Sequence, residues 1–349
     1  MTSDTLKRLK TEGNPLIDGK KVTFLWEGRK APRLMDDLHG WETNPQALKR
    51  IASGLFACSF DLPGDAYLEY AFIDPKTGES IHDPHNKRRI WNGINGYNHY
   101  FYMPEASPNS LVRRRKAVPQ GAITKHIVQP WMLQANGKRA LYLYQPPTDE
   151  PVPLLAVYDG NDYLRRCKLA VMVDNLIAEK RIRPLAMVFL QHGGPRRFLE
   201  YACSEATLAW LVHEVLPLAR RELNLLDVEK HPSAYGVLGA SMGGLMALYT
   251  GLRMPQVFGN VMSQSGAFEF EQFDTITLDL VKHLPKRDLR IWMDAGKLEW
   301  LLESSQKMSA LLKSNGYDLT YREFSGGHNY TAWRDDIWRG LETLFGMEK

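Results

Sequence analysis

The sequence predicts an α/β protein with two domains, a small β-sandwich followed by a mostly parallel sheet that carries helices on both faces. Three observations lead to this prediction. The chain has 349 residues, more than a single core usually accommodates. Residues 20–104 contain short stretches in which apolar and polar side chains alternate. After residue 121, continuous apolar runs separate longer helical patterns, which is typical of a parallel sheet covered on both sides.

The overall composition excludes several classes of protein. Hydrophobic residues make up 44% of the chain and charged residues 24%, as in a folded globular protein. Lys and Arg number 44 against 40 Asp and Glu, a surplus too small to indicate nucleic-acid binding. The sequence contains neither the apolar segment of a signal peptide nor a membrane span, and its three cysteines have no metal-binding or disulfide spacing. We therefore expect a cytoplasmic protein without a membrane partner, and the composition indicates no oligomeric state.

Residues 1–105 are predicted to form the β-sandwich. The stretches VTFLWEG, GLFACSFDLP, AYLEYAFIDP and NHYFYMP alternate aromatic or branched side chains with polar ones, between turns of Gly, Pro and Asp. One short helix is expected among these strands, at residues 45–51. The following segment, 106–120, loses the alternation and contains four consecutive basic residues, which indicates a linker.

Residues 121–349 predict the larger domain. AITKHIVQP and RALYLYQP have the pattern of an opening hairpin, and six apolar runs follow, from PLLAVYDG to LTYREFSGG. Helical patterns lie between the runs, including residues 204–223, 243–253 and 299–315. Open α/β sheets bind ligands at the carboxyl ends of their strands, so we expect the functional residues there.

The candidate nucleophile is Ser241, in the G-x-S-x-G segment Gly239-Ala-Ser-Met-Gly243. An apolar strand precedes this segment and an apolar helix follows it, which is the arrangement that presents a serine hydroxyl on a strained turn in an α/β-hydrolase fold. The amide of Met242 begins the helix and is one candidate oxyanion donor. A second donor is expected among Gly160, Asn161 and Asp162, directly after the PLLAVYDG strand.

The candidate base is His328. In an α/β-hydrolase fold an acid and then a histidine follow the serine along the chain, and His328 is the only histidine beyond His283. It lies in a glycine-rich loop between a predicted strand and a final helix. Two carboxylates could orient its imidazole, Asp294 at the end of the strand LRIWM and Glu299 a few residues later. Their spacing alone does not decide between them.

Several motifs recur in a fixed order along nearly the whole chain, and in this order they resemble the enterochelin esterases, which are hydrolases of catecholate siderophores. The motifs are FYMP at residues 101–104, Tyr158-Asp-Gly160, Arg197-Phe-Leu-Glu-Tyr201, Gly239-Ala-Ser-Met-Gly-Gly244, Gly296-Lys-Leu-Glu-Trp300 and Gly326-Gly-His328 followed by Trp333-Arg334. The resemblance implies Ser241 as the nucleophile and His328 as the base. It also favours Glu299 over Asp294 as the acid, because Gly296-x-x-Glu299 matches the family's segment. Asn329 departs from the pattern, since relatives often carry an acidic residue there.

The resemblance further implies the substrate, an ester of a strongly anionic catecholate siderophore such as ferric enterobactin. The expected substrate-binding residues are Arg196, Arg197 and Trp300. The two arginines are expected because cations would attract such a ligand. Hydrolysis of its trilactone backbone would lower its affinity for Fe(III). The chemistry of a serine esterase needs no cofactor, and no resident metal is expected.

Two alternatives stay open at this stage. The first domain also resembles the early-set immunoglobulin-like modules of glycogen-processing enzymes, so the protein could be a feruloyl or acetyl esterase whose first domain binds glycan. In that case aromatics such as Trp91, Tyr97 and Tyr100 would stack on sugar rings, although aromatics in a β-sandwich more often belong to its core. The second alternative is a ligand-binding protein that kept the fold without catalysis. The presence of serine, histidine and acid together disfavours it.

Overall fold

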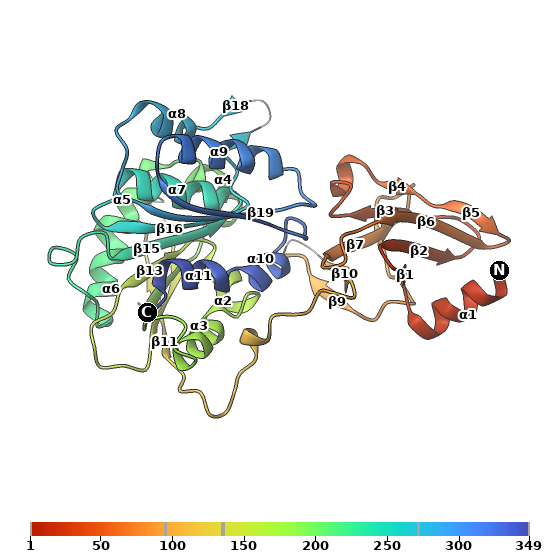
Figure 1. Ribbon diagram of the computed structural model, residues 1–349, viewed down its shortest axis with the longest axis horizontal. Coiled ribbons are helices and arrows are strands. Elements are labelled where there is room, and N and C mark those ends of the chain that lie inside the picture. The colour runs from red at the N-terminus through yellow and green to blue at the C-terminus, as the bar shows by residue number, and fades with distance from the viewer. Residues whose placement is uncertain (1, 94–95, 134–136, 271–272, 348–349) are drawn as a thin grey trace. The chain divides into compact units, whose positions relative to one another are not determined.

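The computed structural model describes residues 2–93, 96–133, 137–270 and 273–347, and this part of the chain divides into two compact units (Figure 1). The first unit comprises the described residues up to Pro108, together with Gly296–Trp300 and Phe324–Ala332. The second comprises the described residues of Asn109–Ala295, Leu301–Glu323 and Trp333–Lys349. The domain boundaries expected from the sequence at residues 105 and 121 stay a prediction.

Two antiparallel sheets build the first unit, after a helix α1 (Thr2–Glu12). One sheet has the order β1-β2-β6-β5, with the bounds Leu16–Asp18, Lys21–Glu27, Leu55–Asp61 and Lys49–Ala52. The other has the order β4-β3-β7-β10-β9, and β8 pairs with β7. Its strands are β3 (Arg33–Asp36), β4 (Gln46–Ala47), β7 (Tyr67–Ile73), β8 (Ser80–Ile81), β9 (Arg89–Trp91) and β10 (Tyr97–Tyr102), and a short 3-10 helix η1 (Trp41–Thr43) precedes β4.

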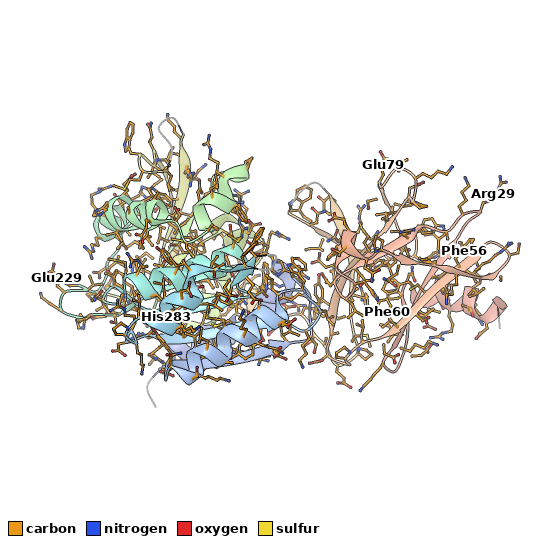
Figure 2. The ribbon with its side chains drawn as sticks, turned by 90° about the horizontal axis from the view of Figure 1, so that it is seen from above. Arg29, Phe56, Phe60, Glu79, Glu229 and His283 are labelled. Atoms are coloured by element: carbon orange, nitrogen blue, oxygen red, sulfur yellow. The ribbon has the colours of Figure 1, made fainter. Side chains whose placement is uncertain are left out.

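Both sheets contribute to one apolar core, as in a β-sandwich. Phe24 on β2 and Phe72 on β7 are fully buried in it. Phe60 lies on β6 (Figure 2). Its ring stacks on that of Phe24, with ring centroids 5.5 Å apart. Leu298, from the later segment Gly296–Trp300, belongs to the same core. The predicted sandwich is therefore confirmed, and its core includes a residue from a segment late in the chain.

The helix predicted at residues 45–51 is wrong. This segment forms the strands β4 and β5, and β5 pairs with β6 through Lys49 opposite Ala57 and Arg50 opposite Phe56. A helix of seven residues makes few internal hydrogen bonds and is marginal by itself. A neighbouring strand satisfies the same backbone groups, so pairing with a distant segment decides the structure. Helix α1 was not predicted, since its sequence is almost entirely polar and charged.

The second unit contains an eight-stranded sheet in the order β11-β12-β14-β13-β15-β16-β19-β20. The first two strands form the predicted hairpin and pair antiparallel, whereas β14, β13, β15, β16 and β19 pair parallel. The strand bounds are β11 (Ala122–Val128), β12 (Arg139–Gln145), β13 (Leu154–Val157), β14 (Ala186–Leu190), β15 (Tyr235–Ala240), β16 (Phe258–Gln264), β19 (Arg290–Gly296) and β20 (Asp318–Phe324). β17 (Glu269–Phe270) and β18 (Phe273–Asp274) form a separate small hairpin.

Helices cover both faces of this sheet, with α7, α8 and α9 on one face and α3 and α11 on the other (Figure 1). The predicted α/β architecture is therefore confirmed. The α-helices are α2 (Gly160–Arg165), α3 (Leu169–Ala178), α4 (Arg197–Tyr201), α5 (Glu205–Trp210), α6 (Leu216–Glu222), α7 (Met242–Arg253), α8 (Ile276–His283), α9 (Leu302–Ser314), α10 (Tyr330–Asp336) and α11 (Trp338–Phe345). Short 3-10 helices lie at η2 (Ser110–Val112) and η3 (Gly194–Arg196), and a π-helix η4 (Leu211–Val215) joins α5 to α6. Within the described ranges, no helix has the length and apolarity needed to cross a membrane.

Candidate active site

Ser241 lies in the turn between β15 and α7. Its backbone has φ 58° and ψ −124°, a conformation that a residue with a side chain rarely adopts. The Ser241 N–H donates to the carbonyl of Gln264 at 2.9 Å, and the Ser241 carbonyl accepts the first helical bond of α7 from Leu245 N–H at 3.0 Å. The turn is thus fixed on both sides, and the hydroxyl stands at the carboxyl end of β15.

Gly239 explains why this turn needs small residues. A Cβ on Gly239 would lie 2.1 Å from the carbonyl oxygen of Gly243. The strand and the first turn of α7 approach so closely there that any side chain would force them apart. The structure therefore supplies the steric reason for the glycine of the G-x-S-x-G pattern.

Two helix starts supply the candidate oxyanion amides within the second unit. Met242 is the first residue of α7, and its side chain is buried. Gly160 and Asn161 are the first two residues of α2, directly after Asp159, which itself has φ 52°. The first α2 amides with a helical partner are those of Asp162 and Tyr163, which donate to the Asp159 carbonyl. Amides in a helix's first turn have no helical acceptor and suit a developing negative charge.

His328 and Glu299 meet within the first unit. The Nδ1 atom of His328 lies 2.9 Å from Oε2 of Glu299, and the Glu299 side chain is fully buried. The other oxygen of Glu299 accepts the Gly296 N–H at 3.1 Å, which fixes the carboxylate. Trp300 covers the imidazole with its ring centroid 4.6 Å away, while 62% of the Trp300 surface stays exposed.

Asp294, the other carboxylate considered from the sequence, has a different environment. It is fully buried inside β19, and its Oδ2 accepts the Gln264 side-chain amide at 2.8 Å. Its backbone carbonyl accepts Ser265 N–H at 2.8 Å. Asp294 thus links two neighbouring strands, β16 and β19, whereas Glu299 is the carboxylate that contacts His328.

Arg197 pairs with Asp159 instead of pointing into solvent. Its Nε lies 2.7 Å and its Nη2 2.6 Å from the two oxygens of Asp159, and Nη2 also lies 3.4 Å from the Ala240 carbonyl. Asp159 is 1% exposed, so this two-point ion pair neutralises a buried carboxylate. The guanidinium therefore ties the start of α2 to the residue before Ser241, and a substrate contact by Arg197 stays a prediction.

No separate role was predicted for Asp159. Its place directly after an apolar strand was a usable signal, because residues at that end of a parallel strand often carry function. Its partner, 38 residues later, could not be identified from spacing. Arg196 is exposed at the end of η3, and a substrate contact by Arg196 stays a prediction.

We expect Arg197→Leu to destabilise the fold by about 2–4 kcal/mol, because it leaves the Asp159 carboxylate buried without its cation. Urea denaturation measures this loss. Arg196→Ala is the matched control and should stay within about 0.5 kcal/mol of the wild type, since Arg196 is exposed. Equal stability of the two variants would contradict a structural role for the Arg197–Asp159 pair.

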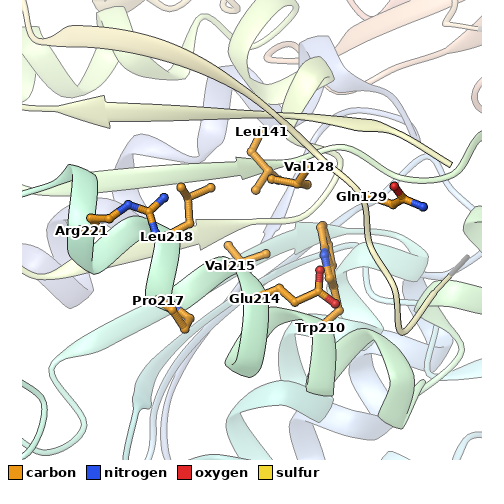
Figure 3. A pocket seen from close by; sticks show the side chains of 9 residues that line it. All are labelled: Val128, Gln129, Leu141, Trp210, Glu214, Val215, Pro217, Leu218 and Arg221. Atoms are coloured by element: carbon orange, nitrogen blue, oxygen red, sulfur yellow. The ribbon is translucent and has the colours of Figure 1, made fainter. Parts of the chain in front are cut away.

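A pocket of about 300 Å³ lies elsewhere in the second unit (Figure 3). Its walls come from β11, β12 and the segment α5-η4-α6, and include Leu141, Trp210 and Leu218, with Glu214 and Arg221 among its polar residues. None of the residues predicted for the active site lines it. The pocket is therefore separate from the chemistry described above.

The strand order and the strained turn between β15 and α7 define an α/β-hydrolase fold, and the catalytic role of Ser241 stays a prediction. The chain belongs to the esterase family: the model described as "Putative esterase" matches residues 134–344.

Relatives of nearly full length carry a more specific name. The chain is 26% identical to an iron(III) enterobactin esterase of Dickeya dadantii, over 95% of this chain and 90% of that protein. It is also similar in structure to a ferric enterobactin esterase of Salmonella typhimurium, with a TM-score of 0.79 and 21% identity over 98% of each chain. The enterobactin esterase of Shigella flexneri, crystallised in the presence of enterobactin, has a TM-score of 0.74 and 22% identity, with 93% of this chain and 92% of that one covered. The resemblance to the enterochelin esterases is therefore confirmed.

Proposed function

We propose that this protein is a serine esterase that hydrolyses the trilactone ester bonds of a catecholate siderophore such as ferric enterobactin, which releases the iron. The observation that carries the proposal is the buried Glu299 carboxylate on Nδ1 of His328, in a chain whose Ser241 occupies a nucleophile turn. The substrate class is supported by the names of relatives that match both units, including the first.

Glu299 sets the protonation pattern of the imidazole. With Nδ1–H donating to the carboxylate, Nε2 carries the lone pair and can accept a proton. As His328 takes the proton of Ser241, the imidazole becomes positive, and the buried carboxylate stabilises this charge. Glu299 thus favours the histidine form that a base requires.

The reaction then follows acyl-enzyme chemistry. The Ser241 oxygen attacks an ester carbonyl, and the amides of Met242 and of Gly160 or Asn161 hold the resulting oxyanion. His328 gives its proton to the leaving serine oxygen of the trilactone. Water, activated by the same imidazole, hydrolyses the acyl-enzyme and restores Ser241.

Arg196 and Trp300 supply exposed surface for an anionic aromatic ligand. Arg196 is a cation on η3, and Trp300 presents an exposed ring beside His328. Catecholate rings stack on flat aromatics, and their negative charge favours a nearby guanidinium. We also propose that the protein acts in the cytoplasm, because Cys58, Cys167 and Cys203 all carry free thiols.

Mass spectrometry of the products tests the substrate. Purified protein is incubated with enterobactin, with and without iron, and in parallel with feruloyl and acetyl sugars. We expect linear dihydroxybenzoyl-serine products from enterobactin and little turnover of the sugars. Turnover of the sugars alone would replace the siderophore with a carbohydrate ester. If the purified protein hydrolyses none of these esters and is not labelled by a fluorophosphonate, the result would support the non-catalytic alternative.

A further inference from the structure

The loop that carries His328 is held by the β-sandwich of the first unit at alternate residues. Ser325 accepts the Tyr67 N–H on its carbonyl at 2.9 Å, and Asn329 donates its side-chain amide to Oδ2 of Asp37 at 3.2 Å. Thr331 shares a side-chain hydrogen bond with Tyr67. Asp37 directly follows β3 and Tyr67 begins β7. Residues at the ends of two strands of one sheet therefore contact the loop before and after His328.

Gly327 shows how close this approach is. A Cβ on Gly327 would lie 2.1 Å from the carboxyl carbon of Asp37, so the loop backbone rests directly on that side chain. Only a residue without a side chain leaves room for it. The residue before His328 therefore contacts Asp37 by its backbone, and the residue after it contacts Asp37 by a hydrogen bond.

Asp37 is itself rigidly placed. The Glu69 N–H donates to Oδ2 at 2.8 Å, the Trp41 indole N–H donates to Oδ1 at 3.1 Å, and only 2% of the residue is exposed. Burial, reinforced by the nearby Glu69 carboxylate, raises the pKa of Asp37 well above its usual range. A neutral amide at position 329 supplies a donor without adding a further negative charge.

The side chain of Asn329 makes two hydrogen bonds, one to Asp37 and one to the start of α10. Its Nδ2 faces Asp37, while its Oδ1 accepts the Ala332 N–H at 2.9 Å and so caps the first turn of α10. His328 lies between the Asp37 contact and Glu299. Its direction is thus set by two carboxylates, one that touches the imidazole and one that touches the backbone beside it.

We propose that Asp37 and Asn329 are positioning residues for catalysis, which makes the β-sandwich part of the catalytic machinery. The inference rests on the proposed function, because it holds that the sandwich orients His328, the base of the proposed mechanism. Misplacement of a catalytic group by about 1 Å can lower a rate about 100-fold. A residue that holds the loop should therefore affect the rate of chemistry more than substrate affinity.

Asn329→Asp tests the link, because it keeps the acceptor for Ala332 but places a carboxylate against Asp37. We expect kcat to fall by about 10- to 100-fold with KM changed less than about threefold. The readout is kcat per active site, counted by exhaustive fluorophosphonate titration and measured on a p-nitrophenyl ester. Adding Asp37→Asn to this variant supplies a donor again, and should restore kcat several-fold.

Asn14→Asp is the matched control. Asn14 is also a buried asparagine of the first unit, and its Nδ2 donates to the buried Asp83 at 2.8 Å. Among the described residues, its side chain bonds to Leu25 and Asp83 and makes no hydrogen bond to the His328 loop. It should lower the melting temperature as Asn329→Asp does, with kcat per active site unchanged. If Asn329→Asp fails to fold, Tyr67→Phe is the second variant. It removes the hydroxyl that contacts Thr331 and that also donates to Oε1 of Glu69 at 3.0 Å, and it should lower kcat several-fold.

Three results would overturn the inference. The first is an unchanged kcat per active site in Asn329→Asp, or in Tyr67→Phe if that variant replaces it. The second is an equal fall of kcat in Asn14→Asp. The third is no gain in kcat when Asp37→Asn is added to Asn329→Asp. A wild-type protein that neither hydrolyses the ester nor reacts with the fluorophosphonate would instead remove the proposed function, and this inference with it. The wild-type titration therefore separates the two failures.

Discussion

Ser241→Ala is expected to lower kcat on enterobactin by about 10⁴- to 10⁶-fold, because it removes the hydroxyl oxygen that is acylated in the proposed mechanism. Binding of the siderophore should stay within a few-fold of the wild type, since the remaining surface is intact. Product formation by liquid chromatography and ligand binding by fluorescence quenching measure the two effects. Labelling by a fluorophosphonate should disappear as well.

Ser233→Ala is the matched control for this variant. Ser233 also has a positive φ, 63°, and lies just before the other end of β15, where its hydroxyl donates to the Pro255 carbonyl. Replacing it removes the hydroxyl of another serine with a positive φ without touching the proposed site. Turnover should be retained in Ser233→Ala. Substantial turnover in Ser241→Ala would show that another group is the nucleophile.

Glu299→Gln is the prediction with the next largest effect, a loss of about 10²- to 10⁴-fold in kcat. The side chain keeps its shape but loses the charge that stabilises the imidazolium and orients Nδ1. The loss should be smaller than that of His328→Ala if a neighbouring group substitutes in part. Steady-state kinetics on a p-nitrophenyl ester, normalised to titrated sites, measure both variants.

Asp294→Asn separates the two carboxylates. Asp294 accepts a hydrogen bond from Gln264 inside the sheet, so its replacement should reduce stability while kcat per active site changes less than about threefold. A severe loss of kcat in Asp294→Asn with Glu299→Gln neutral would reverse the assignment of the acid. The two amides differ by one methylene, which makes the comparison close.

Local patterns in the sequence predicted the parts of the molecule that short-range physics determines. The strained turn at Ser241 follows from glycines within two residues of it, and the apolar runs predicted the parallel strands because both faces are buried. Contacts between distant segments were not predictable. Residues 45–51 formed strands because β6 pairs with them, and Asn329 contacts Asp37 across 292 positions.

The choice of the carboxylate that orients His328 likewise depended on contacts between distant segments. Spacing left Asp294 and Glu299 open, since both follow apolar residues of the same strand closely. The distance of 2.9 Å between Glu299 and His328 distinguishes them, and it depends on how two loops fold together. No single-sequence pattern contains that distance. The Arg197–Asp159 pair was missed for the same reason.

An experimental structure of the protein with Ser241 phosphonylated by a fluorophosphonate tests the mechanism most directly. We expect Nε2 of His328 within about 2.6–3.2 Å of the Ser241 oxygen or of the adduct's alkoxy oxygen, with Nδ1 still on Glu299. We also expect the phosphoryl oxygen on the amide of Met242. An adduct on a different residue, or an imidazole too distant to reach Ser241, would contradict this mechanism.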